Sequence, residues 1–159
     1  MSCKKPPEYP KTPEISFLNI SKKAVYKYVG PSSPRVLTDS VTISLYFKDG
    51  NGDIGRNDDT DNFFCKVFLK KNGRFYDLID STDKTKPATI VDKNGRFFSL
   101  NPDGRQGPIE GILNYGPRLN LTLLVDSTYY ILKFQVHIKD NNGNASNVVE
   151  TPEIGVRLY

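Results

Sequence analysis

Apolar residues occupy every second position along much of the chain, which is the spacing of β-strands that bury one face. The alternation is clearest over residues 41–48, 63–70 and 130–139, where mostly polar side chains fill the intervening positions. Shorter stretches with a similar pattern begin near residues 15, 75, 97, 119 and 145. Asn-Gly pairs at 72–73 and 94–95 mark tight turns. No segment keeps helical spacing over three turns, so the pattern predicts strands throughout.

Seven or eight short strands separated by turns are typical of an antiparallel sandwich. We therefore predict an all-β fold, an antiparallel immunoglobulin-like or fibronectin-III-like β-sandwich of about seven to eight strands. Tyr130 follows Asp126-Ser127-Thr128-Tyr129 and is in phase with the apolar face of its strand. This arrangement resembles the tyrosine corner of such sandwiches, although a core aromatic residue would show the same phase.

The composition fits one globular domain with a core of ordinary size. The chain has 159 residues, and its 37% hydrophobic and 25% charged residues exclude a disordered chain. Residues 14–159 form the predicted domain, and residues 1–13 form a polar, proline-rich segment before it. The net charge of +4 includes no long run of Lys or Arg, so no nucleic-acid partner is expected.

The two cysteines, Cys3 and Cys65, have different surroundings. Cys65 lies within a strand pattern, which predicts a small buried side chain. Cys3 follows Met1-Ser2 and precedes a charged, proline-rich stretch, an arrangement that resembles the end of a bacterial lipoprotein signal. The resemblance implies a lipid on Cys3, a membrane contact through that lipid, and a location in the bacterial cell envelope, at the outer membrane or cell surface.

The proline-rich stretch would act as a tether if Cys3 carries the lipid. In an extended polyproline-like form, residues 3–13 would span about 30 Å, which is enough to hold a domain clear of the bilayer. The alternative is a native cytosolic start with an incidental cysteine.

The pattern from Cys3 through the loop after Asp49 to Asn144-Ala145-Ser146-Asn147 resembles the uncharacterised immunoglobulin-like lipoproteins of Bacteroidetes. The likeness covers most of the chain. It implies a β-sandwich fold and a cell-envelope location, but it brings no known activity.

The stretch Asp49-Gly50-Asn51-Gly52-Asp53-Ile54-Gly55 places side-chain oxygens at every second position of a glycine-rich loop. Calcium takes six to eight oxygen ligands, and alternate loop positions supply them in EF-hand sites. Asp49, Asn51 and Asp53 fill the first, third and fifth places of such a loop. The spacing therefore predicts a calcium site here.

Other positions of the loop match an EF-hand less well. The carbonyl of Gly55 and the side chain of Asn57 fall at the seventh and ninth places, but Ile54 and Thr60 break the pattern at the sixth and twelfth. The remaining carboxylates must therefore come from Asp58, Asp59, Asp61 or the loop that begins at Asp140. The candidate metal ligands are Asp49, Asn51, Asp53 and Asp59, with calcium as the expected cofactor. The alternative is an ordinary loop built from Asp-Gly and Asn-Gly turns.

An immunoglobulin-like strand order would bring a second polar loop beside this one. The strands over residues 41–48 and 130–139 run in the same direction in that fold, so the loops that follow them gather at one pole. The second loop, residues 140–147, contains Asp140, Asn141, Asn142 and Asn144. We therefore predict that the two loops meet.

No sequence motif indicates catalysis. His137 is the single histidine, and the chain has no Gly-x-Ser-x-Gly motif, so a serine-histidine hydrolase is not indicated. Outward-facing aromatic rings at Tyr46, Phe64 and Phe68 are either covered by another segment, such as Phe97-Phe98, or available to a protein or glycan partner.

The function that fits these features is that of a non-catalytic, lipid-anchored binding or interaction module of the cell envelope, with calcium stabilising its loop pole. One alternative is a small polysaccharide-acting hydrolase or an accessory subunit of a surface glycan-uptake assembly. Another is a structural subunit completed by strand exchange, which requires an unpaired edge strand.

Overall fold

Antiparallel strands make up most of the structure. The computed structural model describes residues 7–28, 31, 34–80, 85, 89–90, 92–101, 103–119 and 129–158. The strands are β1 (Glu14–Tyr28), β2 (Arg35–Asp49), β3 (Phe63–Lys71), β4 (Arg74–Asp77), β5 (Ile79–Asp80), β6 (Thr89–Ile90), β7 (Ile109–Tyr115), β8 (Tyr129–Ile138), β9 (Val149–Glu150) and β10 (Ile154–Arg157). Across these described ranges, no helix is long and apolar enough to cross a membrane.

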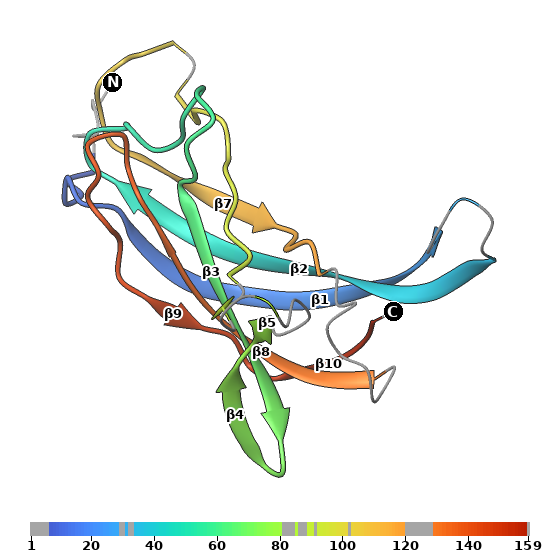
Figure 1. The fold of residues 1–159 in the computed structure, drawn as a ribbon. Helices are drawn as coiled ribbons and strands as arrows, with labels where there is room; N and C mark the ends of the chain where they lie inside the picture. The colour runs from blue at the N-terminus through green and yellow to red at the C-terminus, as the bar shows by residue number, and fades with distance from the viewer. Residues whose placement is uncertain are drawn as a thin grey trace.

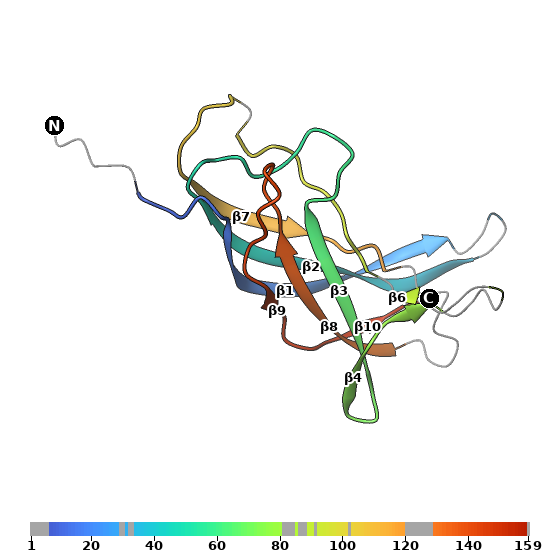
Figure 2. The same ribbon diagram turned by 60° about the vertical axis from the view of Figure 1, so that its left-hand side comes forward.

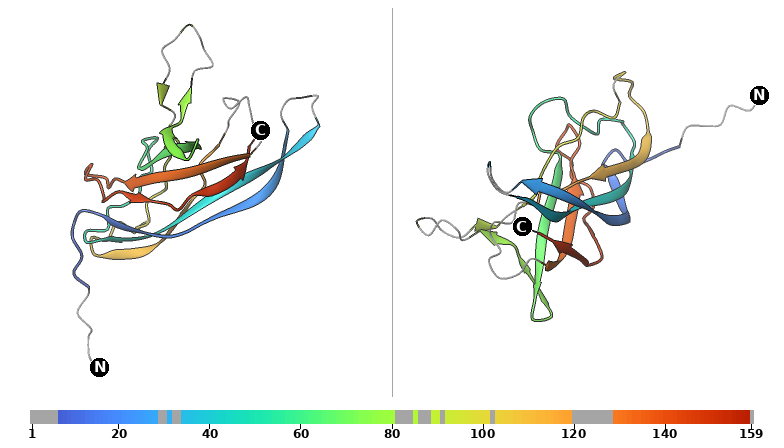
Figure 3. Two further views of the ribbon diagram at one scale, coloured as in Figure 1. Left: turned by 90° about the horizontal axis from the view of Figure 1, so that it is seen from below. Right: turned by 90° about the vertical axis from the view of Figure 1, so that its right-hand side faces the viewer.

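Two antiparallel sheets face each other across the core. The first has the order β1-β2-β7, and the second has the order β10-β8-β3-β4, with β9 also pairing with β8. A short ribbon of β5 and β6 belongs to neither sheet. Figure 1 shows the long strands of one sheet crossing those of the other, and the left view of Figure 3 shows the sheets as two layers. The predicted all-β, antiparallel β-sandwich is therefore confirmed.

Alternate residues of the long strands form the core. The largest fully buried side chains include Phe63, Phe134, Ile43, Leu45, Ile54, Leu78, Leu132 and Ile138. Removing each such side chain from water contributes roughly 1.5–3 kcal/mol. Cys65 lies among them as a free cysteine, and burial raises the pKa of its thiol to about 12. It acts as a small apolar side chain, as predicted.

Tyr130 is also part of this core. Tyr130 lies at the start of β8 and pairs there with Val156 of β10. Residues 126–128, which the predicted tyrosine corner would include, lie outside the described residues, so the corner stays a prediction.

The hairpin of β1 and β2 is longer than the sequence pattern indicated. The two strands pair from Glu14 with Lys48 to Tyr28 with Arg35, whereas the clear alternation begins only at Val41. β7 pairs with β2 only from Ile43 onward, so the far end of the hairpin projects beyond its neighbour, as Figure 2 shows. Most residues at that end are exposed on both faces. Apolar and polar residues therefore do not alternate there, and the sequence pattern did not show the full length of the strands.

The strand β7 carries no clear sequence signal. Its inward positions include Gly111, and a Cβ there would lie 3.2 Å from the ring of Phe47. Its outward positions include Ile112, which is largely exposed. With a glycine at an inward position and an isoleucine at an outward one, polar and apolar residues do not alternate here. The sequence pattern therefore did not predict this strand.

The stretch predicted as a strand near residue 97 is not a regular strand, and the one predicted from residue 119 lies almost wholly outside the described residues. Residues 92–95 run along β3 as an irregular edge, with isolated bridges from Phe63 to Gly95 and from Lys66 to Asp92. Residues 97–100 instead bond to the loop before β3, at Ile54 and Arg56. Beyond Leu119, which is buried, residues 120–128 lie outside the described residues.

Candidate functional site

The loop after β2 and the loop after β8 meet at one end of the sandwich. The backbone amide of Asn141 donates to the carbonyl of Asp53 at 3.1 Å, and the side-chain amide of Asn142 donates to Oδ2 of Asp53 at 2.6 Å. We call residues 49–62 and 140–147 together the loop pole. The predicted contact between the loops is present, and Figure 2 shows both at the same end of the molecule.

The first part of the pole folds tightly around Asp49. This residue is fully buried, and its Oδ2 accepts a hydrogen bond from the amide of Asp53 at 3.1 Å. Gly52 has a φ of 72°, a left-handed value that glycine adopts without steric cost. Ile54 is fully buried and bridges to Asp140. The apolar residue that breaks the EF-hand spacing therefore anchors the loop in the core.

Three side-chain oxygens of this loop are buried without a hydrogen-bond partner. They are Oδ1 of Asp49, Oδ1 of Asn51 and Oδ1 of Asp53. Buried polar atoms nearly always have a partner, because leaving one unpaired costs roughly 1–3 kcal/mol. Three such atoms on one short loop, at alternate positions, form a donor set suited to a hard cation such as calcium.

Negative charge accumulates at the same place. Burial raises the pKa of Asp49 to about 6, with the charge of Asp53 as the next cause and that of Asp140 as a further one. Burial followed by the charge of Asp140 raises the pKa of Asp53 as well. The carboxylate of Asp140 is itself buried and accepts hydrogen bonds from the backbone and side chain of Asn144. A bound cation would offset this charge.

The structure does not bring Asp59 into this set. Its carboxylate pairs with Arg96, and its side chain is 98% exposed. The neighbouring Asp58 pairs with Arg56 at 2.7 Å, and this hydrogen bond is the main cause that lowers the pKa of Asp58 to about 2. Because Arg56 and Arg96 hold these two acids at the surface, we leave Asp59 out of the site and retain Asp49, Asn51 and Asp53.

The loop supplies only part of a calcium shell. Within the described part of the chain, no three His, Cys, Asp or Glu side chains form a metal-holding group by themselves. Two carboxylates and one amide oxygen therefore need further oxygen atoms to reach the six to eight that calcium takes. Asn57, at the ninth place, uses its Oδ1 to accept the amide of Ser99 at 3.4 Å.

Asn101 and Gly107 support the loop after β2 from another direction. The amide of Gly107 donates to the carbonyl of Asn51 at 3.3 Å, and the side-chain amide of Asn101 donates to the carbonyl of Gly52 at 3.3 Å. Sequence reasoning missed this support, because no local pattern links residues so far apart in the chain.

The N-terminal segment docks on the same loop. The amide of Gly50 donates to the carbonyl of Pro10 at 2.8 Å, and the hydroxyl of Tyr9 donates to Glu110 at 2.7 Å. Lys48 places its ammonium 5.4 Å from the centre of the Tyr9 ring. The extended tether expected over residues 3–13 therefore does not continue through Tyr9 and Pro10. Cys3, the predicted lipid site, lies outside the described residues.

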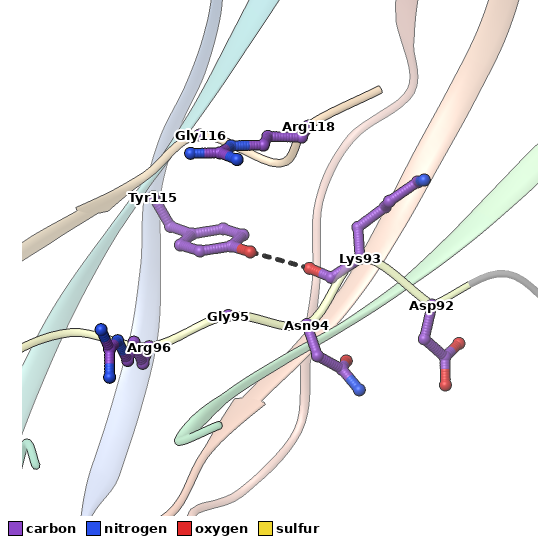
Figure 4. Close-up of a pocket in the computed structure, with 8 residues that line it drawn as sticks. All are labelled: Asp92, Lys93, Asn94, Gly95, Arg96, Tyr115, Gly116 and Arg118. Carbon is purple, nitrogen blue, oxygen red and sulfur yellow. Dashed lines mark hydrogen bonds between the residues drawn. The ribbon is translucent and has the colours of Figure 1, made fainter. Parts of the chain in front are cut away.

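One hollow lies between residues 92–96 and the end of β7. This hollow, of about 550 Å³, is lined by residues 92–96, Tyr115, Gly116 and Arg118 (Figure 4). The hydroxyl of Tyr115 donates to the carbonyl of Lys93 at 2.9 Å and ties its two walls together. Asp92 is the one carboxylate among these lining residues, whereas glycoside hydrolysis uses two.

The outward aromatic rings are partly covered by side chains of their own sheets. Phe64 stacks on His137 with ring centres 4.8 Å apart, and burial followed by the charge of Lys139 lowers the pKa of that histidine. Tyr46 donates its hydroxyl to Glu110. Phe97-Phe98 does not provide the expected cover, since Phe97 packs against the core and Phe98 is exposed.

Comparisons with known proteins identify no family or relative for this chain. No protein-family model matches the chain, and neither the curated proteins nor the solved structures gave a match.

Proposed function

We propose that this protein is a non-catalytic binding module of the bacterial cell envelope, lipid-anchored through Cys3, whose loop pole binds calcium. The observation that carries the calcium part is the set of three buried, unpaired oxygens on Asp49, Asn51 and Asp53. A sandwich supports such a role well, because loops on a rigid scaffold commonly carry its function.

The donor set favours calcium over other common metals. Residues 49–62 contain neither Cys nor His, the side chains on which zinc and copper sites depend. Magnesium requires near-ideal octahedral geometry and tends to keep several waters. Carboxylate and amide oxygens spaced along a loop suit the larger and more adaptable calcium shell.

The envelope part of the proposal rests on the N-terminal sequence. Cys3, followed at once by lysines and prolines, resembles the start of a processed bacterial lipoprotein. A lipid at that position would place the domain beside a membrane. The partner of such a module is expected to be a glycan or another envelope protein.

Calorimetric titration of calcium into chelator-treated protein tests the metal site, with thermal unfolding measured in parallel. We expect a heat of binding and a rise in Tm with calcium. At a free calcium concentration of a hundred times Kd, binding would stabilise the fold by about 2.7 kcal/mol. The absence of both heat and thermal stabilisation at millimolar calcium would overturn the proposal, because even weak extracellular sites bind in that range.

Two variants of the same loop sharpen this test. Asp53→Asn removes a carboxylate from the site and is expected to weaken calcium binding roughly tenfold. Its stability in chelator should match or exceed that of the native protein, because a like-charge repulsion is removed. Asp59→Asn, which changes the exposed carboxylate paired with Arg96, is the control and should bind calcium normally. Equal loss in both variants would contradict the assignment of ligands.

A further inference from the structure

A polar hollow of about 370 Å³ opens beside the candidate calcium site. Its walls come from both loops of the pole and from residues 99, 101 and 104–106. The lining residues used below are Asn51, Asp53, Ser99, Asn101, Gln106 and Asn142. The volume lies within the range of roughly 300–1,000 Å³ that is typical of small-molecule sites.

Two residues belong to both the hollow and the metal loop. Asn51 and Asp53 line the hollow, and each also carries one of the unpaired buried oxygens. A calcium ion held by those oxygens would therefore border the hollow. Since the loop fills only part of the calcium shell, a ligand in the hollow that carries two neighbouring oxygens would complete it.

We propose that this hollow binds a saccharide ring, and that vicinal hydroxyl groups of the ring complete the calcium shell. The inference rests on the calcium site of the proposed function and adds the chemical class of its ligand. Three features of the hollow favour a saccharide over other oxygen ligands: its charge, the chemistry of its walls and their order.

The charge of the site favours a neutral ligand. Two carboxylates, from Asp49 and Asp53, cancel the double positive charge of calcium, and Asp140 acts on Asp49 as a further negative charge. An anionic ligand would therefore gain little net attraction. Of the residues that line the hollow, Arg105 is the one cation, and it is exposed. Hydroxyl oxygens coordinate calcium without adding charge.

The walls match the hydrogen-bonding chemistry of a sugar. The hydroxyl of Ser99 and the amides of Gln106 and Asn142 both donate and accept. The amide of Asn101 offers its oxygen as an acceptor, because its N–H groups already donate to the carbonyls of Gly52 and Arg105. Each hydroxyl of a saccharide likewise donates and accepts, so the two surfaces are complementary.

Internal hydrogen bonds hold the walls in place. The side-chain amide of Asn101 donates to the carbonyl of Gly52 at 3.3 Å, and that of Asn142 donates to Asp53 at 2.6 Å. A ligand entering a hollow that is already ordered loses less affinity to side-chain ordering.

The test is an NMR titration of the full-length protein with the methyl glycosides of mannose, galactose, glucose and fucose. These probes present vicinal hydroxyls in cis and trans, and cyclohexanol, with a single hydroxyl, is the control. We expect at least one glycoside to shift the amide signals of Asn51, Asn101 and Asn142 at millimolar concentration in calcium and not in EDTA. Gln106→Ala should lower the saccharide affinity about fivefold while leaving calcium affinity unchanged, since one hydrogen bond is lost.

The outcomes separate this proposal from the calcium site. Calcium binding with no response to any of the four glycosides overturns the saccharide proposal and leaves the metal site standing. An equal response in EDTA overturns the role of the metal in sugar binding. A response to acetate that exceeds the response to every glycoside overturns the choice of a neutral ligand. Absence of calcium binding removes both proposals together.

Discussion

Gly50 is a residue at which the N-terminal segment contacts the loop after β2. Its amide donates to the carbonyl of Pro10 at 2.8 Å, and it lies between two candidate ligands, Asp49 and Asn51. A Cβ at this position would clash with the backbone oxygens of Tyr9 and Pro10. Glycine is therefore required here for close backbone approach rather than for an unusual φ.

Replacing this glycine should loosen both the segment and the loop. Gly50→Ala is expected to destabilise the fold by about 1–3 kcal/mol, because the clash is with backbone that cannot rotate away. Thermal unfolding measures the loss, and limited proteolysis should show faster cleavage within residues 7–13. Gly116→Ala is the control, since its Cβ would lie 3.5 Å from the nearest atom, the carbonyl oxygen of Val41. Equal Tm values for the two variants would contradict this account.

The candidate ligands were predictable from sequence only where they are local to one another. The spacing of Asp49, Asn51 and Asp53 identified three residues that the structure brings together with unpaired oxygens. Asp59 was an equally plausible ligand by type, but its partner Arg96 lies far along the chain. The spacing of neighbouring residues does not show which side chains the tertiary fold brings together, so the pairing of Asp59 with Arg96 could not be predicted.

At the scale of elements, a polar contact joins the two sheets at β2 and β10. The carboxylate of Asp39 on β2 accepts the backbone amide of Arg157 on β10 at 2.8 Å, and it lies 3.3 Å from the ammonium of Lys22 on β1. The neighbouring hydroxyl of Thr38 donates to the carbonyl of Arg157 at 2.9 Å. Asp39 is buried, so this charged hydrogen bond contributes more than a surface ion pair would.

This contact predicts a defined dependence of stability on pH. The hydrogen bond from the amide of Arg157 is the main cause that lowers the pKa of Asp39 below its usual 3.8, and Lys22 also lowers it. A lowered folded-state pKa means that the stabilisation is complete above about pH 4 and is lost as pH falls through the folded-state value. Urea unfolding should show the native protein about 1–3 kcal/mol more stable than Asp39→Asn near pH 6.

The same comparison at lower pH is decisive. The difference between the native protein and Asp39→Asn should shrink steadily below about pH 4, because the carboxylate becomes protonated in the native protein. A difference that stays constant down to pH 2 would show that Asp39 acts through packing alone.

Elements with one buried face were predictable from sequence, and the others were not. β3, β8 and the part of β2 from Val41 to Asp49 alternate strictly between core and surface, and all three were anticipated from that alternation. β7 and the outer half of β1 lack the alternation, one because of Gly111 and the other because both of its faces are largely exposed. Burial on one face is the physical origin of the alternating pattern, so strands that do not bury one face cannot be recognised from the sequence.

At the scale of the whole molecule, β1 forms one edge of the sandwich. Among the described strands it pairs only with β2, and it carries Lys22, Lys23 and Lys27. Charged side chains on an edge oppose the addition of a further strand. The strand-exchange alternative therefore gains no specific support from this edge.

The proposed anchor makes a prediction about where the protein is found in its own cells. Cys3→Ser should move the protein from the membrane fraction to the aqueous fraction, because the acylated thiol is lost. Cys65→Ala is the control, since this buried cysteine has no access to an acylating enzyme. Membrane fractionation followed by intact-mass measurement reads both the location and the acyl groups. Continued membrane association of Cys3→Ser would contradict lipid anchoring at this residue.

The docking of Tyr9 and Pro10 also bears on which way the domain would face. With these residues held against the sandwich, even a fully extended chain from Cys3 to Tyr9 would span no more than about 20 Å. Because the carbonyl of Pro10 accepts the amide of Gly50 in the loop pole, a lipid on Cys3 would keep this pole close to the bilayer. The far end of the β1–β2 hairpin lies at the opposite end of the sandwich from the N-terminal segment, as Figure 2 shows. A ligand at the pole would be met from the membrane side, so glycans of the cell's own outer layer would be within closer reach than those arriving from the medium.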